Sequence, residues 1–158
     1  MHEHVYSVDV EGSPEEVWGL FWTRRDVPEH DGVSIKILHP GDQVGEGLVR
    51  QCTFRVPRWL LSGGVGRSFE LLTEVRPPVS WKYTAVGKPL WSWAEGFTRL
   101  EPLGAGRTRI HFRETYEAFN PLVRRLLERR VHRFISRDNE RLIAQAVKAG
   151  LARARQAG

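Results

Sequence analysis

The sequence predicts an α+β protein in which a curved antiparallel sheet of seven strands wraps around one long C-terminal helix, with two short helices after the first strand. Two observations predict this class. Between Val33 and Tyr116, apolar residues mostly follow the two-residue period of strands, and turn residues recur roughly every dozen positions. After Asn120 the period becomes that of a helix, with no Gly or Pro between Pro121 and Gly150. The 158 residues are enough for a single domain with one core.

The N-terminal segment predicts a strand followed by a pair of short helices. Residues 5–10 alternate between polar and apolar side chains, as in a strand with one dry face. Ser13 suits a helix N-cap, Pro14 suits the first helical position, and Glu16 completes a capping box. The segment from Arg24 to Gly32 indicates either a break or a second short helix.

The middle of the chain predicts six further strands separated by Gly- and Pro-rich turns. We expect them at residues 33–38, 47–56, 67–75, 80–86, 91–100 and 108–116. Turns at such regular spacing are typical of an antiparallel meander. Glycines inside the strands, such as Gly47 and Gly96, would let the sheet curl around a helix.

The C-terminal helix is expected to be long and amphipathic. Asn120 suits its N-cap and Pro121 its first position, and about 29 residues at 1.5 Å each would span about 43 Å. An apolar stripe follows the helical period and consists of Leu127, Val131, Phe134, Ile135 and Leu142. The small, basic tail of residues 152–158 is expected to fray.

Composition excludes several classes of protein. No run of about 18 apolar residues predicts a membrane span, and the first six residues lack the basic and apolar regions of an export signal. The single cysteine, Cys52, cannot form an internal disulfide, so we expect a cytoplasmic location. The six histidines are scattered, and no spacing predicts a metal site or another cofactor.

The net charge of +5 is concentrated at the C-terminal end of the chain. Residues 121–158 contain ten Lys or Arg and three acidic residues, a balance of +7, whereas residues 1–120 carry −2. An Arg-rich helix face can contact nucleic acid, a membrane surface or an acidic partner, but such a face is more often simply solvated. We expect no nucleic-acid partner. A protein that binds partners through this basic surface is nevertheless one possible function, besides the two given below.

Two motifs and the order of the elements resemble the START-like superfamily, which includes the polyketide cyclase/dehydrase and lipid transport proteins and has the helix-grip fold. The first motif follows the first strand and reads Ser13-Pro14-Glu15-Glu16-Val17-Trp18. The second motif is the Gly-rich turn of residues 102–106, which leads into Thr108-Arg109. The resemblance covers nearly the whole chain, and it implies one domain over residues 1–158.

The same resemblance implies a ligand cavity between the sheet and the long helix. Its mouth would lie between the loops of residues 57–64 and 87–90, whose large apolar side chains suit a gate, a homodimer contact or core packing. Six Trp and three Tyr supply large rings that either wall a cavity or fill a core. The expected ligand contacts are Phe54, Trp59, Leu61, Trp81, Tyr83, Trp91, Trp93, Phe112, Tyr116, Phe134 and Asp138.

Three titratable residues are candidates for acid–base chemistry. Asp138 falls near the centre of the apolar stripe, where a carboxylate is costly unless it is paired, for example with Arg113, or protonated. Glu114 shares a strand face with Phe112 and Tyr116, which suggests the interior of the sheet. His111 is the third candidate, and alternation alone does not determine which face of its strand it occupies. Asp138 and Glu114, together with Tyr83, are also the expected polar anchors for a ligand.

The preferred function is therefore binding, for carriage or sensing, of a small hydrophobic molecule such as a lipid, a sterol or an aromatic polyketide. The alternative allowed by the resemblance is a cofactor-independent polyketide cyclase or dehydratase that enolises a ketone with a cavity Glu, Asp or His. The sequence contains no Ser-His-Asp order, phosphate-binding loop or reactive-cysteine motif that points to other chemistry.

Overall fold

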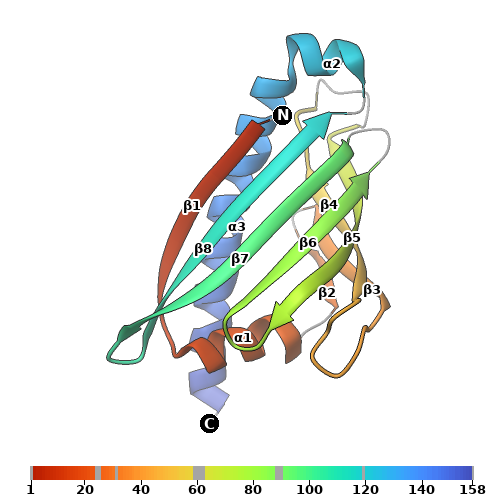
Figure 1. Ribbon diagram of the computed structural model, residues 1–158. Helices are drawn as coiled ribbons and strands as arrows, with labels where there is room; N and C mark the ends of the chain where they lie inside the picture. Colours follow the sequence, from red (N-terminus) through yellow and green to blue (C-terminus); the bar gives the residue numbers. More distant parts are fainter. Residues whose placement is uncertain are drawn as a thin grey trace.

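The computed structural model describes residues 2–23, 26–30, 32–58, 63–87, 91–118 and 120–157. Within these residues the chain forms one antiparallel sheet and three helices (Figure 1). The helices are α1 (Pro14–Thr23), α2 (Pro121–Leu126) and α3 (Glu128–Ala157). The strands are β1 (His2–Glu11), β2 (Val27–His30), β3 (Val33–His39), β4 (Val49–Arg55), β5 (Val65–Arg76), β6 (Ser80–Gly87), β7 (Trp91–Gly104) and β8 (Arg107–Ala118).

The sheet is a meander closed at one edge by the first strand. Its order is β1-β8-β7-β6-β5-β4-β3-β2, so β1 and β2 are the edge strands and α1 connects one edge to the other. Helix α3 runs along the concave side and packs against β1, β8 and α1 (Figure 1). This arrangement confirms the predicted α+β fold, in which a curved sheet holds a long C-terminal helix.

The predicted second short helix is wrong, and the strand count is eight rather than seven. The segment after α1 forms β2, which pairs with β3 through Val27 opposite Ile35 and His30 opposite Val33. Pairing with the free edge of β3 gives this short segment backbone partners that a single helical turn would lack. Pro28 is compatible with this position because β2 is an edge strand.

The C-terminal helix is also not a single rod. Asn120 caps α2 as predicted, since its Oδ1 accepts a hydrogen bond from the Leu122 amide at 2.8 Å. The chain then breaks at Leu127, and α3 begins where the buried Glu128 carboxylate accepts a hydrogen bond from the Ala118 amide at 2.8 Å. At the other end, α3 continues to Ala157. Leu151 is buried, the described side chains after it are exposed, and the expected fraying of residues 152–158 stays a prediction.

The start of α1 confirms the predicted capping box. The Ser13 amide donates to Glu16 Oε2 at 2.6 Å, and the Glu16 amide donates to Ser13 Oγ at 3.2 Å. The helix buries Val17 completely, and its side chain joins the core between the sheet and α3. Leu20 lies against Gly150 of α3, where an added Cβ would come within 2.5 Å of Leu20 Cδ1. A glycine at this position therefore sets how closely α1 and α3 approach.

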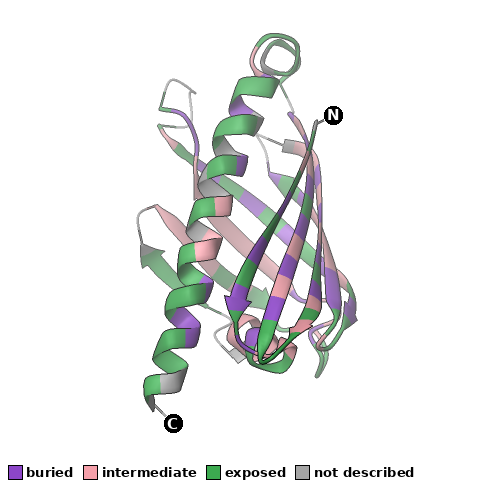
Figure 2. Cartoon of the chain, turned by 90° about the vertical axis from the view of Figure 1, so that its left-hand side faces the viewer, coloured by how far each residue is buried: buried purple, intermediate pink, exposed green. Residues whose placement is uncertain are grey.

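Figure 2 shows buried residues at intervals along the strands of the sheet and along α3. The larger cluster joins β1, β5, β6, β7 and β8 to α1 and the C-terminal half of α3, and includes Tyr6, Ile110, Phe112, Val147 and Leu151. A smaller cluster lies near the other end of α3 and consists of Val56, Ala85, Ala94, Tyr116 and Val131. Tyr83 packs against both clusters.

Candidate functional site

A cavity of about 400 Å³ lies between the concave face of the sheet and helices α1 and α3. This volume falls within the range of pockets that hold small organic ligands. The helices contribute Leu20 and Phe21 from α1 and Ile143, Ala146, Val147, Gly150 and Arg153 from α3. The sheet contributes, among others, Ile35, Arg50, Cys52, Phe54, Ser68, Glu70, Trp81, Tyr83, Ala85, Ala94, Thr98, Phe112, Glu114 and Tyr116.

Aromatic rings form much of the apolar wall without filling the space. Trp81 packs edge-on against Trp18 of α1, with ring centroids 5.3 Å apart, and against Phe21 at 4.9 Å. Phe112 instead stacks on Tyr6 of β1 at 4.7 Å. These contacts hold the Trp81 and Phe112 rings at the edges of the cavity. The apolar wall is therefore kept in place by packing against the hydrophobic core.

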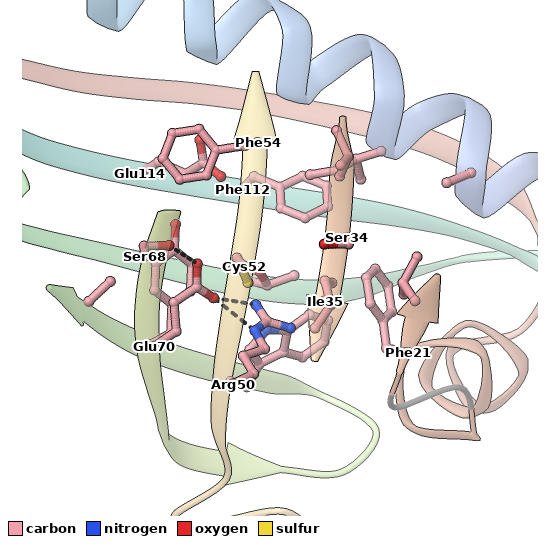
Figure 3. Close-up of a pocket in the computed structure, with 18 of the residues that line it drawn as sticks. Phe21, Ser34, Ile35, Arg50, Cys52, Phe54, Ser68, Glu70, Phe112 and Glu114 are labelled. Carbon is pink, nitrogen blue, oxygen red and sulfur yellow. Dashed lines mark hydrogen bonds and ion pairs between the residues drawn. The ribbon is translucent and has the colours of Figure 1, made fainter. Parts of the chain in front are cut away.

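An ion pair lies on the wall formed by β4 and β5. Arg50 is opposite Glu70 and Cys52 is opposite Ser68, and alternation places all four side chains on the cavity face. Arg50 Nε and Nη2 lie 2.8 and 2.7 Å from Glu70 Oε2, and Ser68 Oγ donates to Glu70 Oε1 at 3.2 Å (Figure 3). Only 22% of the Arg50 side chain and 11% of the Glu70 side chain are exposed, so the pair is largely removed from water.

Burial and neighbouring charges determine the protonation states of Arg50 and Cys52 on this wall. Burial lowers the pKa of the Arg50 guanidinium, but the Glu70 carboxylate outweighs burial, and the pKa is raised overall. Burial, and after it the Glu70 carboxylate, raise the pKa of the Cys52 thiol well above its ordinary value. At neutral pH this wall therefore presents a guanidinium cation and a neutral thiol, and Cys52 is not a thiolate nucleophile.

A second polar group lies across the cavity on β6 and β8. Tyr116 Oη donates to Glu114 Oε2 at 2.5 Å, and both residues line the cavity. Burial, and after it the Glu114 carboxylate, raise the pKa of Tyr116 and of Tyr83 well above the ordinary value. Both phenols therefore stay protonated and can donate hydrogen bonds.

Gly96 sets the position of Tyr83. The two residues are opposite each other on β7 and β6, and a Cβ on Gly96 would overlap the Tyr83 ring. The ring can lie against the backbone of β7 only because residue 96 has no side chain. This close approach leaves space in front of Tyr83, so the glycine predicted to help the sheet curl also helps to keep the cavity open.

The structure brings six of the expected site residues together around the cavity: Phe54, Trp81, Tyr83, Phe112, Glu114 and Tyr116. Trp59 and Leu61 lie outside the described residues. The side chains of Trp91 and Asp138 also lie outside what the structure describes. The loops of residues 57–64 and 87–90 are described only in part, because residues 59–62 and 88–90 lie outside the described ranges. The expectations for these four residues and for the two loops as a gate therefore stay predictions.

Three expected residues lie elsewhere than predicted. Trp93 alternates with Ala94, which lines the cavity, so Trp93 is on the outer face of the sheet. Phe134 is 43% exposed and does not line the cavity, because the buried face of this part of α3 is formed by Glu128, Val131 and Ser136 and Phe134 lies beside that face. His111 Nε2 pairs with Glu101 Oε2 at 2.5 Å, also away from the cavity.

Sequence reasoning missed the polar wall of β4 and β5. Arg50, Cys52 and Phe54 share one face of a strand, and Ser68 and Glu70 share one face of the next strand. This alternation was a readable signal, but charged side chains are usually exposed, and the pattern alone does not place Arg50 opposite Glu70. The contribution of Phe21 and Ile143 also depends on how α1 and α3 dock.

Two further properties of the described residues bear on function. No group of three or more His, Cys, Asp or Glu side chains in the described ranges is placed to hold a metal ion. None of the helices formed by these residues is long and apolar enough to cross a membrane.

The fold is shared with several solved structures. A protein from Thermus thermophilus matches with a TM-score of 0.70 at 17% identity, over 97% of this chain and 99% of that chain. A START superfamily protein from Mycobacterium smegmatis matches with a TM-score of 0.68 at 13% identity, over 98% of this chain and 99% of that chain. The Zhui aromatase/cyclase from a Streptomyces species matches with a TM-score of 0.67 at 16% identity, over 96% of this chain and 94% of that chain. At such identities the likeness concerns the fold alone.

The sequence comparisons identify the family. A search of curated proteins gave no match. The family model described as polyketide cyclase/dehydrase and lipid transport matches residues 1–147, which is most of the chain and includes nearly all of the elements that wall the cavity. With its α+β fold and interior cavity, the chain belongs to the polyketide cyclase/dehydrase and lipid transport family.

Proposed function

We propose that the protein binds a small, mainly hydrophobic molecule in the cavity between the sheet and α3, for carriage or for sensing. The observation that carries this proposal is the cavity of about 400 Å³ with its wall of aromatic and aliphatic side chains. Removing an apolar ligand from water into such a space is favourable in proportion to the area buried. The family description, which includes lipid transport, supports the same class of ligand.

The polar groups of the cavity indicate what the ligand carries besides its apolar body. The neutral Tyr83 phenol can donate a hydrogen bond to a ligand, and the Glu114 carboxylate, which already receives the Tyr116 hydroxyl, can accept a further one. Across the cavity, the Arg50 guanidinium offers N–H groups beyond the two that face Glu70. A ligand with oxygen atoms at two separated positions, such as a hydroxylated or keto-bearing ring system, could form hydrogen bonds with both polar walls.

Thermal stabilisation by ligands tests this proposal. We expect some member of a panel of fatty acids, sterols and aromatic polyketides to raise the melting temperature and to change tryptophan fluorescence, because Trp81 lines the cavity. A ligand at about 100 times its Kd adds about 2.7 kcal/mol, which for a chain of this length raises Tm by about 5–10 °C. If no panel member changes either signal, the proposed binding function is wrong.

A matched pair of variants on α3 locates the site. Ala146 lines the cavity, whereas Ala149, on the same helix, is exposed and does not line it. Ala146→Phe should therefore fill the cavity and weaken ligand binding at least about tenfold, since displaced ligand carbon loses its burial. Ala149→Phe should leave binding unchanged. Equal effects of the two substitutions would place the ligand outside this cavity.

A second candidate function is a cofactor-independent cyclase or dehydratase, and Glu114 is the observation that favours it. Its carboxylate lies in the cavity within hydrogen-bonding distance of the Tyr116 hydroxyl. It would take a proton from the carbon beside a ketone. The enolate would then form a carbon–carbon bond to a second carbonyl, and the resulting alkoxide would take the proton back. Glu114→Gln should then abolish ring closure of a poly-β-ketone while retaining binding. Unchanged turnover would exclude this role for Glu114.

A further inference from the structure

Two exposed leucines mark a surface that the cavity does not explain. Leu122 and Leu126 of α2 are 68% and 69% exposed, which makes them the most exposed large hydrophobic residues in the described part of the chain. They are four residues apart and therefore lie on the same face of α2. Phe134, near the start of α3, is 43% exposed. Large apolar side chains left in water on one helix face, as the two leucines are, are typical of a contact surface.

Arginines flank these apolar residues along the same segment. Those that are exposed and have no described ion pair are Arg125 on α2 and Arg129, Arg130, Arg133 and Arg137 on α3. At 100° per residue, the four α3 arginines and Phe134 fall within an arc of about 140°. All five of these α3 residues are exposed, so this face of α3 is turned toward solvent. We call the three apolar residues and these five arginines the α2–α3 surface.

This charge is not neutralised within the described part of the chain. The only acidic residue between positions 121 and 137 is Glu128, which is buried and accepts the Ala118 amide. Arg124 is used internally, since it donates to the Ala118 carbonyl at 2.8 and 3.0 Å and pairs with Glu117 at 2.8 Å. None of the described carboxylates lies within ion-pair distance of the five arginines of the α2–α3 surface.

The position of two of these arginines strengthens the point. Arg129 and Arg130 lie in the first turn of α3, where the helix dipole is positive and cations are unfavourable. Two cations at the positive end of a helix dipole repel it, and this repulsion is relieved when an anion binds beside them. Helix dipole and guanidinium groups then act together on the same negative charge.

We propose that the α2–α3 surface docks onto an anionic lipid bilayer. Leucine and phenylalanine side chains can enter the boundary between headgroups and acyl chains, while the arginines contact lipid phosphates and carboxylates. A second copy of the chain would place arginines against arginines. A nucleic acid would use the arginines but would leave the two leucines in water. The inference goes beyond ligand binding in the cavity and does not depend on it.

Vesicle flotation of the ligand-free protein tests this proposal. We expect binding to vesicles of phosphatidylcholine with about one-quarter phosphatidylserine, little binding to phosphatidylcholine alone, and weaker binding as salt rises. The double variant Arg129→Gln/Arg133→Gln should weaken binding about 30-fold, since each basic residue near such a surface contributes about fivefold. Leu122→Ser/Leu126→Ser should weaken it at least about tenfold.

Matched controls lie at the other end of the sheet. Arg76→Gln/Arg99→Gln removes two exposed arginines, and Val79→Ser changes a 50% exposed apolar residue in the β5–β6 turn. Neither should change vesicle binding. Ala146→Phe should also bind vesicles normally, which separates docking of the surface from capture of a lipid in the cavity. All variants alter exposed side chains or the cavity, and their melting curves show whether they fold.

Several results would overturn the proposal. One is failure of the folded wild-type protein to bind the anionic vesicles at low salt. Another is binding that survives both the arginine and the leucine substitutions. Tight binding to duplex DNA that depends on Arg129 and Arg133 but not on Leu122 and Leu126 would assign the surface to nucleic acid instead. Dimerisation that is lost in Leu122→Ser/Leu126→Ser would assign it to a second copy.

Discussion

The ion pair of Arg50 and Glu70 should contribute to stability mainly because each charge compensates the burial of the other. Arg50→Leu would leave the Glu70 carboxylate on a largely buried wall without its cationic partner, although Ser68 would still donate a hydrogen bond to it. We expect a loss of about 1–3 kcal/mol in the free energy of unfolding, at the lower end for buried pairs because both side chains keep some contact with water. Urea denaturation measures this loss.

The double variant Arg50→Leu/Glu70→Leu is the control for that experiment. Replacing both charges leaves no unpaired ion, so we expect it to be more stable than Arg50→Leu alone. A double variant whose loss equals or exceeds the sum of the two single losses would contradict the idea that the unpaired carboxylate causes the damage.

Asp9, an exposed residue of β1, should make the stability of the protein depend on pH. Its carboxylate receives hydrogen bonds from Arg109 Nε and Nη2 at 2.7 and 2.8 Å, and these bonds hold its pKa below the ordinary value of 3.8. A carboxylate with a lowered pKa stabilises the fold above the unfolded pKa, and this contribution is lost as pH falls through the folded value. Acid titration of unfolding should therefore show a steeper loss below pH 3.8 in the wild type than in Asp9→Asn.

Ionic strength provides the check on this prediction. The pair is solvent-exposed, so added salt should shrink the difference between wild type and variant. Identical acid profiles of the two proteins at low salt would show that the Arg109 contact does not contribute to stability.

At the level of single residues, strand alternation predicted the cavity face of β6 and β8 correctly. Phe112, Glu114 and Tyr116 follow the two-residue period, and so do Trp81 and Tyr83. Alternation does not tell which of the two faces is the concave one when both carry large rings. For this reason the pattern alone cannot place Trp93, whose neighbour Ala94 holds the cavity position.

The contact between α1 and α3 depends on a glycine. An added Cβ at Gly150 would approach Leu20 Cδ1 to 2.5 Å and Cγ to 3.2 Å. Gly150→Val should therefore destabilise the protein by about 1–3 kcal/mol through overpacking, even though valine is the better helix former. Thermal or urea unfolding gives the value.

Two comparisons make this test specific. Ala149→Val, at an exposed position of the same helix, should cost only the small difference in helix propensity. Combining Leu20→Ala with Gly150→Val should recover part of the loss. No recovery in the combined variant would mean that Leu20 is not the group that collides.

Elements with strong periodicity were predictable from the sequence, and those decided by tertiary contacts were not. The capping box and the long runs of alternation predicted α1 and seven of the strands. The short β2 has little periodicity of its own, and its state depends on the free edge of β3. The break at Leu127 depends on a hydrogen bond from Ala118 to Glu128, which joins the end of one element to the start of another.

Across the whole molecule, stability should be unevenly distributed. β8 alternates buried residues along its length and lies between two long strands, whereas β2 has four residues and lies at the edge. Amides of β7 and β8 should exchange with deuterium most slowly and those of β2 and β3 fastest, because edge strands open without global unfolding. Native-state hydrogen exchange with mass spectrometry measures this order. Equal protection of β3 and β8 would contradict it.

Among the described residues, α3 packs mainly against one side of the sheet, along β1 and β8, and against α1. The opposite margin, β2 and β3, borders the same hollow through Val27, Val33 and Ile35. We expect β2 and β3 to move outward more easily than β1, which packs against α3. A bulkier guest would push β2 and β3 outward and lose only a few peripheral hydrogen bonds. Affinity should then decline gradually with guest width, without a sharp cutoff, and related compounds of different girth should all be accepted.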